Sequence, residues 1–250
     1  MRDILRSRAL EDIPHGFSTR DGLEAEEILA NSVLVRVTQV HSAHAVVAEA
    51  AWDIPPEADA IVTATGGLAL AIVTADCAPV LLSDNAAGVV AAAHAGWRGA
   101  VQGVLENTVD AMCRLGAQPA SISAAIGPTI AQSSYEVDSQ FRTRLAEADH
   151  RFLAPGCAGH WQFDLPGYVA ERLRTAGVGW IDDLSAPDPS SLYNLWGLLP
   201  WAAPEPGTIL ALIFIGILPL LLGVSMWLQQ KLNPAPTDPT QQMIFAWMPW

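Results

Sequence analysis

The segment between Glu205 and Lys231 contains no charged side chain, and its apolar run 208–228 constrains the fold of the whole chain. A run of about 20 apolar residues has the length that crosses a bilayer as an α-helix. A buried core helix usually keeps a polar stripe, whereas this run has none. Trp201 and Trp227 lie near its two ends, where membrane helices carry aromatic belts. The run therefore predicts a transmembrane helix, with any water-soluble domain before it.

Charge divides the 250-residue chain in the same region. Residues 1–187 carry 12 basic and 23 acidic side chains, whereas residues 188–250 carry Lys231 and three acidic residues. The pattern predicts a globular domain over 1–187, a linker over 188–205 and a membrane fragment over 206–250. The net charge of −13 excludes a general nucleic-acid binder, because such a protein needs a basic face.

Cysteine usage and the N-terminus bear on the compartment. Three cysteines without a CxxC pair are typical of a reducing compartment. No long apolar run follows Met1, so no secretory signal is visible. We expect the globular domain to lie in the cytoplasm, tethered to the membrane if residues 206–230 span it.

Residues 1–187 show the pattern of a layered α/β (α+β) domain with a mixed β-sheet. Apolar, partly β-branched runs indicate buried strands, and a stretch of period 3.6 ahead of Gly116 indicates a helix. The elements lack a strict βαβ rhythm and neither GxGxxG nor GxxxxGK[ST] occurs, which argues against a doubly wound nucleotide fold. The predicted strands are 68–74, 80–83, 89–94 and 122–126, and the predicted helices are 100–115, 138–148 and 166–177.

Three side chains at predicted strand ends form a candidate metal site. Cys77 follows one predicted strand, His94 ends another, and His41 follows the short strand-like run 33–37. Residues at strand ends converge on one edge of a sheet, so the three side chains could meet. Two imidazoles and one thiolate suit zinc, and three protein ligands leave a fourth position open, as in catalytic sites. The spacing alone also fits a buried cysteine and two hydrogen-bonded histidines.

The loop His94-Ala-Gly-Trp-Arg-Gly99 adds a candidate anion site. Small residues bring the backbone close to a ligand just before a predicted helix begins, where amide groups favour an anion. The guanidinium of Arg98 could bind the same anion with two parallel hydrogen bonds. The pattern predicts a binding site for a phosphate or an oxyanion beside His94, and an ordinary loop with an exposed arginine is the alternative.

Six motifs follow one another along residues 10–184. They are His15-Gly-Phe-Ser-Thr-Arg-Asp-Gly22, Thr38-Gln-Val-His-Ser42, Asp59-Ala-Ile-Val-Thr63, Thr74-Ala-Asp-Cys-Ala-Pro79, His94-Ala-Gly-Trp-Arg-Gly99, and Ile126-Gly-Pro128 with Tyr135-Glu-Val137. In this order and spacing they resemble the YfiH family, which is also named laccase-domain, polyphenol oxidase or peptidoglycan editing factor.

This resemblance implies a zinc-binding enzyme of purine nucleoside metabolism. The implied activities are phosphorolysis of adenosine, inosine, guanosine and methylthioadenosine, and deamination of adenosine. The nucleoside and phosphate are the implied partners. By matching position, His41, Cys77 and His94 are the implied zinc ligands, and the last two are also implied catalytic residues, together with Arg98. The implied substrate-binding residues are Arg20, Asp76 and Arg98.

Two other chemistries remain open for the same residues. A multicopper oxidase needs many histidines, usually in HxH pairs, whereas this chain has six histidines and no HxH. A single blue-copper centre usually has an axial methionine ligand. Residues 1–187 contain only Met1 and Met112, so copper is a less favoured metal here than zinc. The other alternative is a metal-free hydrolase, with Cys77 as nucleophile and His94 as its base.

The sequence departs from the YfiH pattern in two places. A longer Gly- and Asn-containing segment usually follows Gly22, whereas only residues 23–36 lie here before the Gln-Val-His motif. The family's Cys-Thr-Tyr-like stretch and its Arg- and Gly-rich tail are absent after Ile181-Asp-Asp-Leu184. Both losses would remove substrate contacts.

Three further motifs lie after residue 190 and do not belong to the YfiH pattern. They are Leu198-Leu-Pro-Trp201, Pro219-Leu-Leu-Leu-Gly-Val-Ser-Met-Trp-Leu-Gln-Gln-Lys-Leu-Asn-Pro-Ala-Pro-Thr-Asp-Pro-Thr240 and Met243-Ile-Phe-Ala-Trp-Met-Pro-Trp250. Over about residues 192–250 they resemble the late transmembrane region of the YidC/Oxa/Alb membrane insertases. One spanning helix and the start of another lack the helix bundle that insertion needs, so we expect no insertase activity.

Nothing physical links a cytosolic nucleoside enzyme to part of an insertase. The segment Ser185-Ala-Pro-Asp-Pro-Ser190 therefore predicts the join of a chimeric or misassembled reading frame. A real membrane-tethered enzyme is the alternative.

Overall fold

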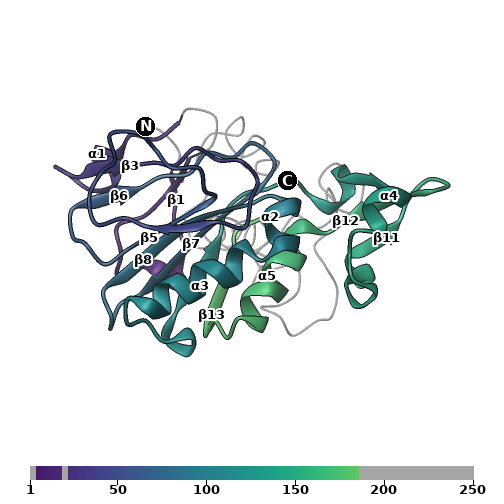
Figure 1. Ribbon diagram of the computed structural model, residues 1–250. Helices are drawn as coiled ribbons and strands as arrows, with labels where there is room; N and C mark the ends of the chain where they lie inside the picture. The colour runs from purple at the N-terminus through teal and green to yellow at the C-terminus, as the bar shows by residue number, and fades with distance from the viewer. Residues whose placement is uncertain (1–3, 19–21, 186–250) are drawn as a thin grey trace, which may run out of the picture. The chain divides into compact units, whose positions relative to one another are not determined.

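A computed structural model of the chain describes residues 4–18 and 22–185 (Figure 1). All of these residues belong to the first of the two units into which the chain divides, residues 1–186. Within the described residues, no helix is long and apolar enough to cross a membrane. The predicted transmembrane run 208–228 lies outside them.

A six-stranded mixed sheet forms the centre of the described domain. Its strands are β4 (Ala45–Val47), β5 (Ala60–Thr63), β7 (Ala78–Asp84), β8 (Val89–Ala95), β9 (Ser123–Ile126) and β13 (Trp180–Asp183). The order is β13-β9-β7-β8-β5-β4, with antiparallel pairs in the middle and a parallel pair at each edge. The predicted layered α/β domain with a mixed sheet is thereby confirmed.

Two longer helices, α3 (Val104–Arg114) and α5 (Leu165–Thr175), cover one face of this sheet (Figure 1). Leu105 of α3 and Tyr168 of α5 are fully buried in the main core, together with Leu82 of β7. Strand β8 is built largely from alanine, which lets α3 lie close against the sheet.

Short segments from the first part of the chain pack on the opposite face. Successive strand residues point to opposite faces, so Ile61 points away from the helices that its neighbours contact. Ile61 packs with Val35 of β3 (Val33–Val35), which pairs in parallel with β6 (Leu68–Leu70). Other short elements there include β1 (Ile4–Leu5), a 3-10 turn (Arg8–Leu10), β2 (Phe17–Ser18) and α1 (Ala25–Ile28).

A second, three-stranded sheet lies beside the first in the chain's later part. It has the order β10-β12-β11, formed by β10 (Glu136–Asp138), β12 (His160–Phe163) and β11 (Leu153–Pro155). Phe163 joins it to the main core, because its ring lies 5.7 Å from that of Tyr168 on α5. A single helical turn, α4 (Ser139–Arg142), follows β10.

The helices differ from expectation in two places. The predicted helix 100–115 consists of α2 (Trp97–Gln102) and α3, because Gly103 between them has a φ of 97°, which glycine adopts without strain. The predicted helix 138–148 begins as expected, with Asp138 accepting from the Phe141 amide, but ends at α4. There the Thr143 hydroxyl donates to the Gln140 carbonyl and competes with the helical pattern.

Two strands also differ from expectation. The predicted strand 68–74 stops at Leu70, because its partner β3 is only three residues long. The predicted strand 80–83 begins earlier, at Ala78, and includes Pro79, whose carbonyl accepts from the Gly127 amide at 2.8 Å. Strand β7 therefore begins directly after Cys77.

Candidate metal centre

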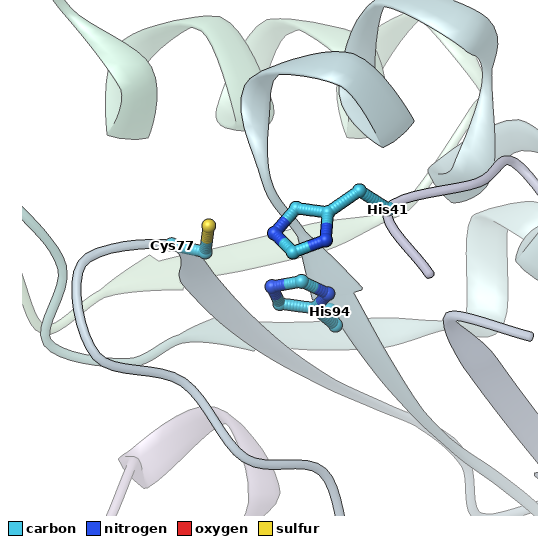
Figure 2. A group of neighbouring side chains, drawn as sticks. All are labelled: His41, Cys77 and His94. Carbon is cyan, nitrogen blue, oxygen red and sulfur yellow. The ribbon is translucent and has the colours of Figure 1, made fainter. Parts of the chain in front are cut away.

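Three side chains from separate segments meet at one edge of the central sheet. The ligand atoms of His41, Cys77 and His94 all lie within 4.8 Å of one another. Figure 2 shows the Cys77 sulfur and the two imidazole rings facing one another. The predicted convergence of these three residues is thus seen in the structure, and their role as metal ligands stays a prediction.

Strand pairing explains how two of the three side chains meet. Cys77 was expected to follow a strand, but it directly precedes β7, and His94 lies next to the end of β8. Because β7 and β8 are antiparallel, the start of one lies beside the end of the other, and Pro79 is paired with His94. The register of this hairpin therefore places the thiol beside the imidazole.

The third side chain, His41, comes from the loop between β3 and β4. Its φ of 59° is in the left-handed region, which few residues other than glycine adopt. Its ring is exposed and packs edge-on against that of His94, with centroids 4.8 Å apart. By contrast, His94 is only 3% exposed.

A buried carboxylate lies behind both histidines. Asp59, which is fully buried, accepts hydrogen bonds from the backbone amides of His41 at 3.0 Å and Ser42 at 2.6 Å, and from the Ser42 hydroxyl at 2.8 Å. It also accepts from Nδ1 of His94 at 2.8 Å. Burial raises the pKa of Asp59, but these hydrogen bonds, that of His94 first, lower the pKa below its usual value.

The hydrogen bond to Asp59 fixes the tautomer of His94. A carboxylate can only accept, so Nδ1 of His94 carries the donated proton. Nε2 of a neutral ring then keeps its lone pair free for a metal. This is the arrangement in which metal-binding histidines are usually held.

Gly96 gives the site its close packing. A β-carbon at this position would lie 2.9 Å from the Cys77 sulfur and 3.2 Å from Cδ2 of His41. The small residues after His94 were expected to bring the backbone close to an anion. The neighbours of Gly96 are the candidate metal ligands instead, and the anion site stays a prediction. Gly96 also precedes the first residue of α2.

A second contact holds the two loops that carry His41 and Cys77. The Gln39 side chain donates from Nε2 to the Val73 carbonyl and accepts at Oε1 from the Val73 amide, each at 2.8 Å. These two hydrogen bonds connect the segment before Cys77 to the segment before His41.

The environment of Cys77 disfavours a free thiolate. Burial raises the pKa of the Cys77 thiol, and the negative charges of Asp76 and Asp59 raise it further. A reactive cysteine needs the opposite shift, whereas a bound cation would stabilise the thiolate. The environment therefore fits a metal ligand better than a metal-free nucleophile.

The donor set fits zinc. Two neutral imidazoles and one thiolate are typical zinc ligands. A tetrahedral site separates such ligands by about 3.5 Å, so the ligand atoms here, which lie within 4.8 Å of one another, would move closer together around the metal. A blue-copper site would need a weak axial ligand, but Met112 is fully buried in the main core with α3. Within the described residues, no second cluster of this kind accompanies the three side chains.

The other predicted site residues do not contact the cluster by any hydrogen bond within the described part of the chain. Arg98 is exposed, and its guanidinium lies 5.3 Å from the centroid of the Trp97 ring. Asp76 is exposed next to Cys77, and its carbonyl accepts from the Thr129 hydroxyl at 2.6 Å. Arg20 lies outside the described residues.

Comparison with known proteins decides the family. The family described as multi-copper polyphenol oxidoreductase laccase matches residues 15–186, which is more than half of the chain. The chain belongs to this family. The family implies a metal, and the cluster of His41, Cys77 and His94 is where the structure could hold one.

Two solved structures agree with membership of this laccase family. A Neisseria meningitidis protein described as DUF152 is 34% identical, with a TM-score of 0.58, over 63% of this chain and 65% of that one. The Bacillus licheniformis hypothetical protein YfiH is 28% identical, with a TM-score of 0.55, over 61% of this chain and 63% of that one. The resemblance to the YfiH family is confirmed, and the chain spans somewhat less than two thirds of these proteins.

The later part of the chain has other relatives. The family described as 60Kd inner membrane protein matches residues 159–250. The membrane protein insertase YidC of Roseobacter denitrificans is 82% identical over 84 residues, which are 33% of this chain and 14% of that protein. The resemblance to the insertases is confirmed. It is longer than the predicted stretch 192–250, and the two family matches share residues 159–186.

Sequence reasoning did not single out Asp59 as part of the site. A signal was available, because Asp59 is the one charged residue in the apolar stretch Ala58-Asp-Ala-Ile-Val62. A charge that a strand carries into the core needs donors around it. Here the donors are the two segments that carry the candidate histidine ligands.

Proposed function

We propose that residues 1–187 form a zinc-dependent purine nucleoside phosphorylase. The observation that carries the proposal is the convergence of His41, Cys77 and His94 at one sheet edge, in a chain of the laccase family. The proposed substrates are phosphate and a purine nucleoside, namely adenosine, inosine, guanosine or methylthioadenosine. Deamination of adenosine is proposed as a second activity of the same site.

The proposed reaction exchanges one bond at the sugar. The bond between C1′ of the sugar and N9 of the purine breaks, and a bond forms between C1′ and a phosphate oxygen. The purine leaves with the electron pair and takes up a proton. Zinc held by the three side chains would supply Lewis-acid polarisation of a substrate oxygen.

Arg98 is the proposed phosphate-binding residue. Its guanidinium is exposed, lies beside Trp97 and forms no ion pair with a described residue. A guanidinium in that state is available to an anion, which it binds with two parallel hydrogen bonds. Asp76 beside Cys77, and Arg20, are the other proposed substrate contacts.

The two alternative chemistries are less well supported. A Cys77–His94 hydrolase needs an activated thiolate, whereas burial raises the pKa of this thiol. A copper oxidase agrees with the description of the family, but the six histidines of this chain include no HxH pair. Zinc chemistry uses all three residues of the cluster.

The experiment uses the full 250-residue chain, purified in detergent because of its apolar run. The chain is incubated with inosine or adenosine, with and without phosphate, and the products are separated by chromatography. We expect free purine base that requires phosphate, is lost in Cys77→Ala and is kept in Cys113→Ala, a cysteine outside the cluster.

Other outcomes of this experiment are equally informative. Inosine formed from adenosine would establish the second proposed activity, and inosine without any free purine base would show deamination in place of phosphorolysis. Absence of both products from a folded, zinc-loaded chain would contradict the proposed function.

We infer that the chain is a chimera of such an enzyme and part of an insertase. The inferred parts are the enzyme domain over 1–187, a linker over 188–205 and a membrane fragment over 206–250. The part of the chain that matches the Roseobacter insertase covers 14% of that protein's length, and this match supports the division into two parts. Because the two family matches overlap at 159–186, the source gene is to be sequenced across codons 155–195. A continuous frame there would show a natural, membrane-tethered enzyme instead.

A further inference from the structure

We propose that Asp59 is the positioning residue of the metal centre, and that its carboxylate holds two of the three ligands in binding geometry. The inference rests on the metal site of the proposed function, but not on the reaction assigned to that site. Asp59 is fully buried, so its effect would pass through His41 and His94.

The first link is to His94, through both main chain and side chain. Oδ1 of Asp59 accepts from Nδ1 of His94 at 2.8 Å, and the Asp59 carbonyl accepts from the His94 amide at 2.7 Å. The ring therefore has one orientation, with Nε2 directed to the cluster. An imidazole held in this way binds a metal more tightly, because its orientation and its proton are fixed in advance.

The second link is to the loop that carries His41. Three successive backbone amides, those of Val40, His41 and Ser42, donate to the same carboxylate at 3.3, 3.0 and 2.6 Å. Successive amides converge on one anion when a residue among them is left-handed, as His41 is with its φ of 59°. The conformation that directs the amides inward is thus the conformation that presents the His41 ring to the cluster.

The charge of Asp59 points to a cation nearby. Within the described residues, its one charged or chargeable partner is His94, and no lysine or arginine pairs with it. A buried carboxylate without a counter-charge is costly. A metal ion bound at Nε2 of His94 would balance this charge through the ring.

Only a carboxylate suits this position. All five groups that reach the Asp59 side chain act as donors: the amides of Val40, His41 and Ser42, the Ser42 hydroxyl and Nδ1 of His94. An asparagine has nearly the same shape, but its NH₂ group would face amides that cannot accept. Asp59→Asn therefore removes the charge and disturbs one of the two links, while it changes the volume little.

The test compares Asp59→Asn with Asp84→Asn in the full chain. Asp84 is a matched control, because it is 2% exposed and accepts from the backbone amides of Ala86, Ala87 and Gln118, none of which is a candidate ligand. Zinc affinity is measured by competition with a chelator, and the unfolding temperature by circular dichroism. We expect Asp59→Asn to bind zinc about 10–100-fold more weakly and Asp84→Asn to bind it as the wild type does.

Equal zinc affinity in the wild type and Asp59→Asn would overturn the proposal. So would an equal loss in both variants, because that would show a general effect of destabilisation. If Asp59→Asn does not fold, the wild type still provides a test through ¹⁵N spectra of its histidine side chains without metal. We expect His94 to be protonated at Nδ1 with a free Nε2, and a proton on Nε2 with Nδ1 free would overturn the proposal.

These readouts do not depend on nucleoside cleavage. A chain that binds zinc in the expected way but cleaves no nucleoside would contradict the proposed function and leave the role of Asp59 intact. If the wild-type chain cleaves nucleosides and Asp59→Asn binds zinc with unchanged affinity, the proposed function is supported and the proposed role of Asp59 is contradicted.

Discussion

The candidate metal centre has two parts that are held in different ways. The strand half is His94, and the loop half consists of His41 and Cys77. His94 lies inside β8, is 3% exposed and is fixed by strand pairing and by Asp59. His41 lies on a loop, is exposed and is held through its backbone, while Cys77 precedes the first residue of β7. The strand half is set by the fold, and the loop half depends on a few local contacts.

This difference indicates which side chains would move when a metal binds. The ligand atoms spread over up to 4.8 Å, wider than the roughly 3.5 Å of a tetrahedral zinc site. His94 has little freedom, because its ring and its backbone are both hydrogen-bonded. Closure of the site would therefore come from His41 and Cys77.

Removing the imidazole from each half should have the largest and most unequal effects. His94→Ala should lose stoichiometric zinc and about 1–3 kcal/mol of unfolding free energy, because the buried Asp59 carboxylate loses a partner. His41→Asn should also lose zinc, but with a change below about 0.5 kcal/mol, since position 41 is exposed and asparagine tolerates a left-handed backbone. Urea unfolding and zinc analysis of both variants test this, and equal destabilisation would contradict the distinction between the halves.

Filling the space at Gly96 should act mainly on the loop half. Gly96→Ala places a methyl group 2.9 Å from the Cys77 sulfur and 3.2 Å from the His41 ring, so one of them must shift. We expect zinc affinity to fall about tenfold or more with little loss of stability. Gly66→Ala is the control, because a β-carbon there meets nothing within 4 Å. Unchanged affinity in Gly96→Ala, measured by chelator competition, would show that the cluster is not the metal site.

Cutting the tie between the loops should have a smaller effect. Gln39→Ala removes both hydrogen bonds to Val73, each of which is exposed to solvent. We expect zinc to bind a few-fold more weakly, with faster dissociation, because the His41 and Cys77 segments move more independently. Stopped-flow transfer of zinc to a chelator measures the dissociation rate. If zinc dissociates from Gln39→Ala as slowly as from the wild type, the hydrogen bonds of Gln39 do not stabilise the metal site.

The smallest expected effect at the site is that of Asp84, which lies outside both halves. Hydrogen bonds from the Gln118 amide first, and from Ala87 and Ala86, hold the pKa of Asp84 below its ordinary value of 3.8, against the effect of burial. Its stabilisation is therefore present above pH 3.8 and is lost as pH falls through the lower native pKa. Asp84→Asn should be about 1–2 kcal/mol less stable than the wild type at pH 7, with the difference shrinking below pH 3.8. Urea unfolding at several pH values measures this, and a difference that grows in acid would contradict the assignment.

The strand half was easier to predict from the sequence than the loop half. The apolar runs around Val80 and Val89 predict two adjacent strands, and a strand end next to His94 follows from them. The convergence of His41 depended on Asp59, whose neighbours are distant in the sequence, and on a left-handed backbone at a non-glycine residue. Local patterns do not contain such long-range hydrogen bonds, so the placement of His41 after a strand-like run only allowed the three side chains to meet, and the family motifs then implied that they form one site.

Helix lengths show the same limit. The predicted helix 166–177 is found as α5, because its start and its end are encoded locally by Asp164 and Gly177. The predicted helix 100–115 is interrupted at Gly103, whose left-handed backbone with a φ of 97° separates α2 from α3. Caps can be read from a few residues, whereas a break inside a regular apolar pattern depends on tertiary packing.

The metal content of the purified chain tests most directly whether His41, Cys77 and His94 form a zinc site. The full chain is expressed without added metal, and zinc and copper are measured by mass spectrometry in the wild type and in Cys77→Ala. We expect about one zinc per wild-type chain, no stoichiometric copper, and loss of the zinc in the variant. Stoichiometric copper in the wild type, or zinc retained in Cys77→Ala, would contradict this expectation.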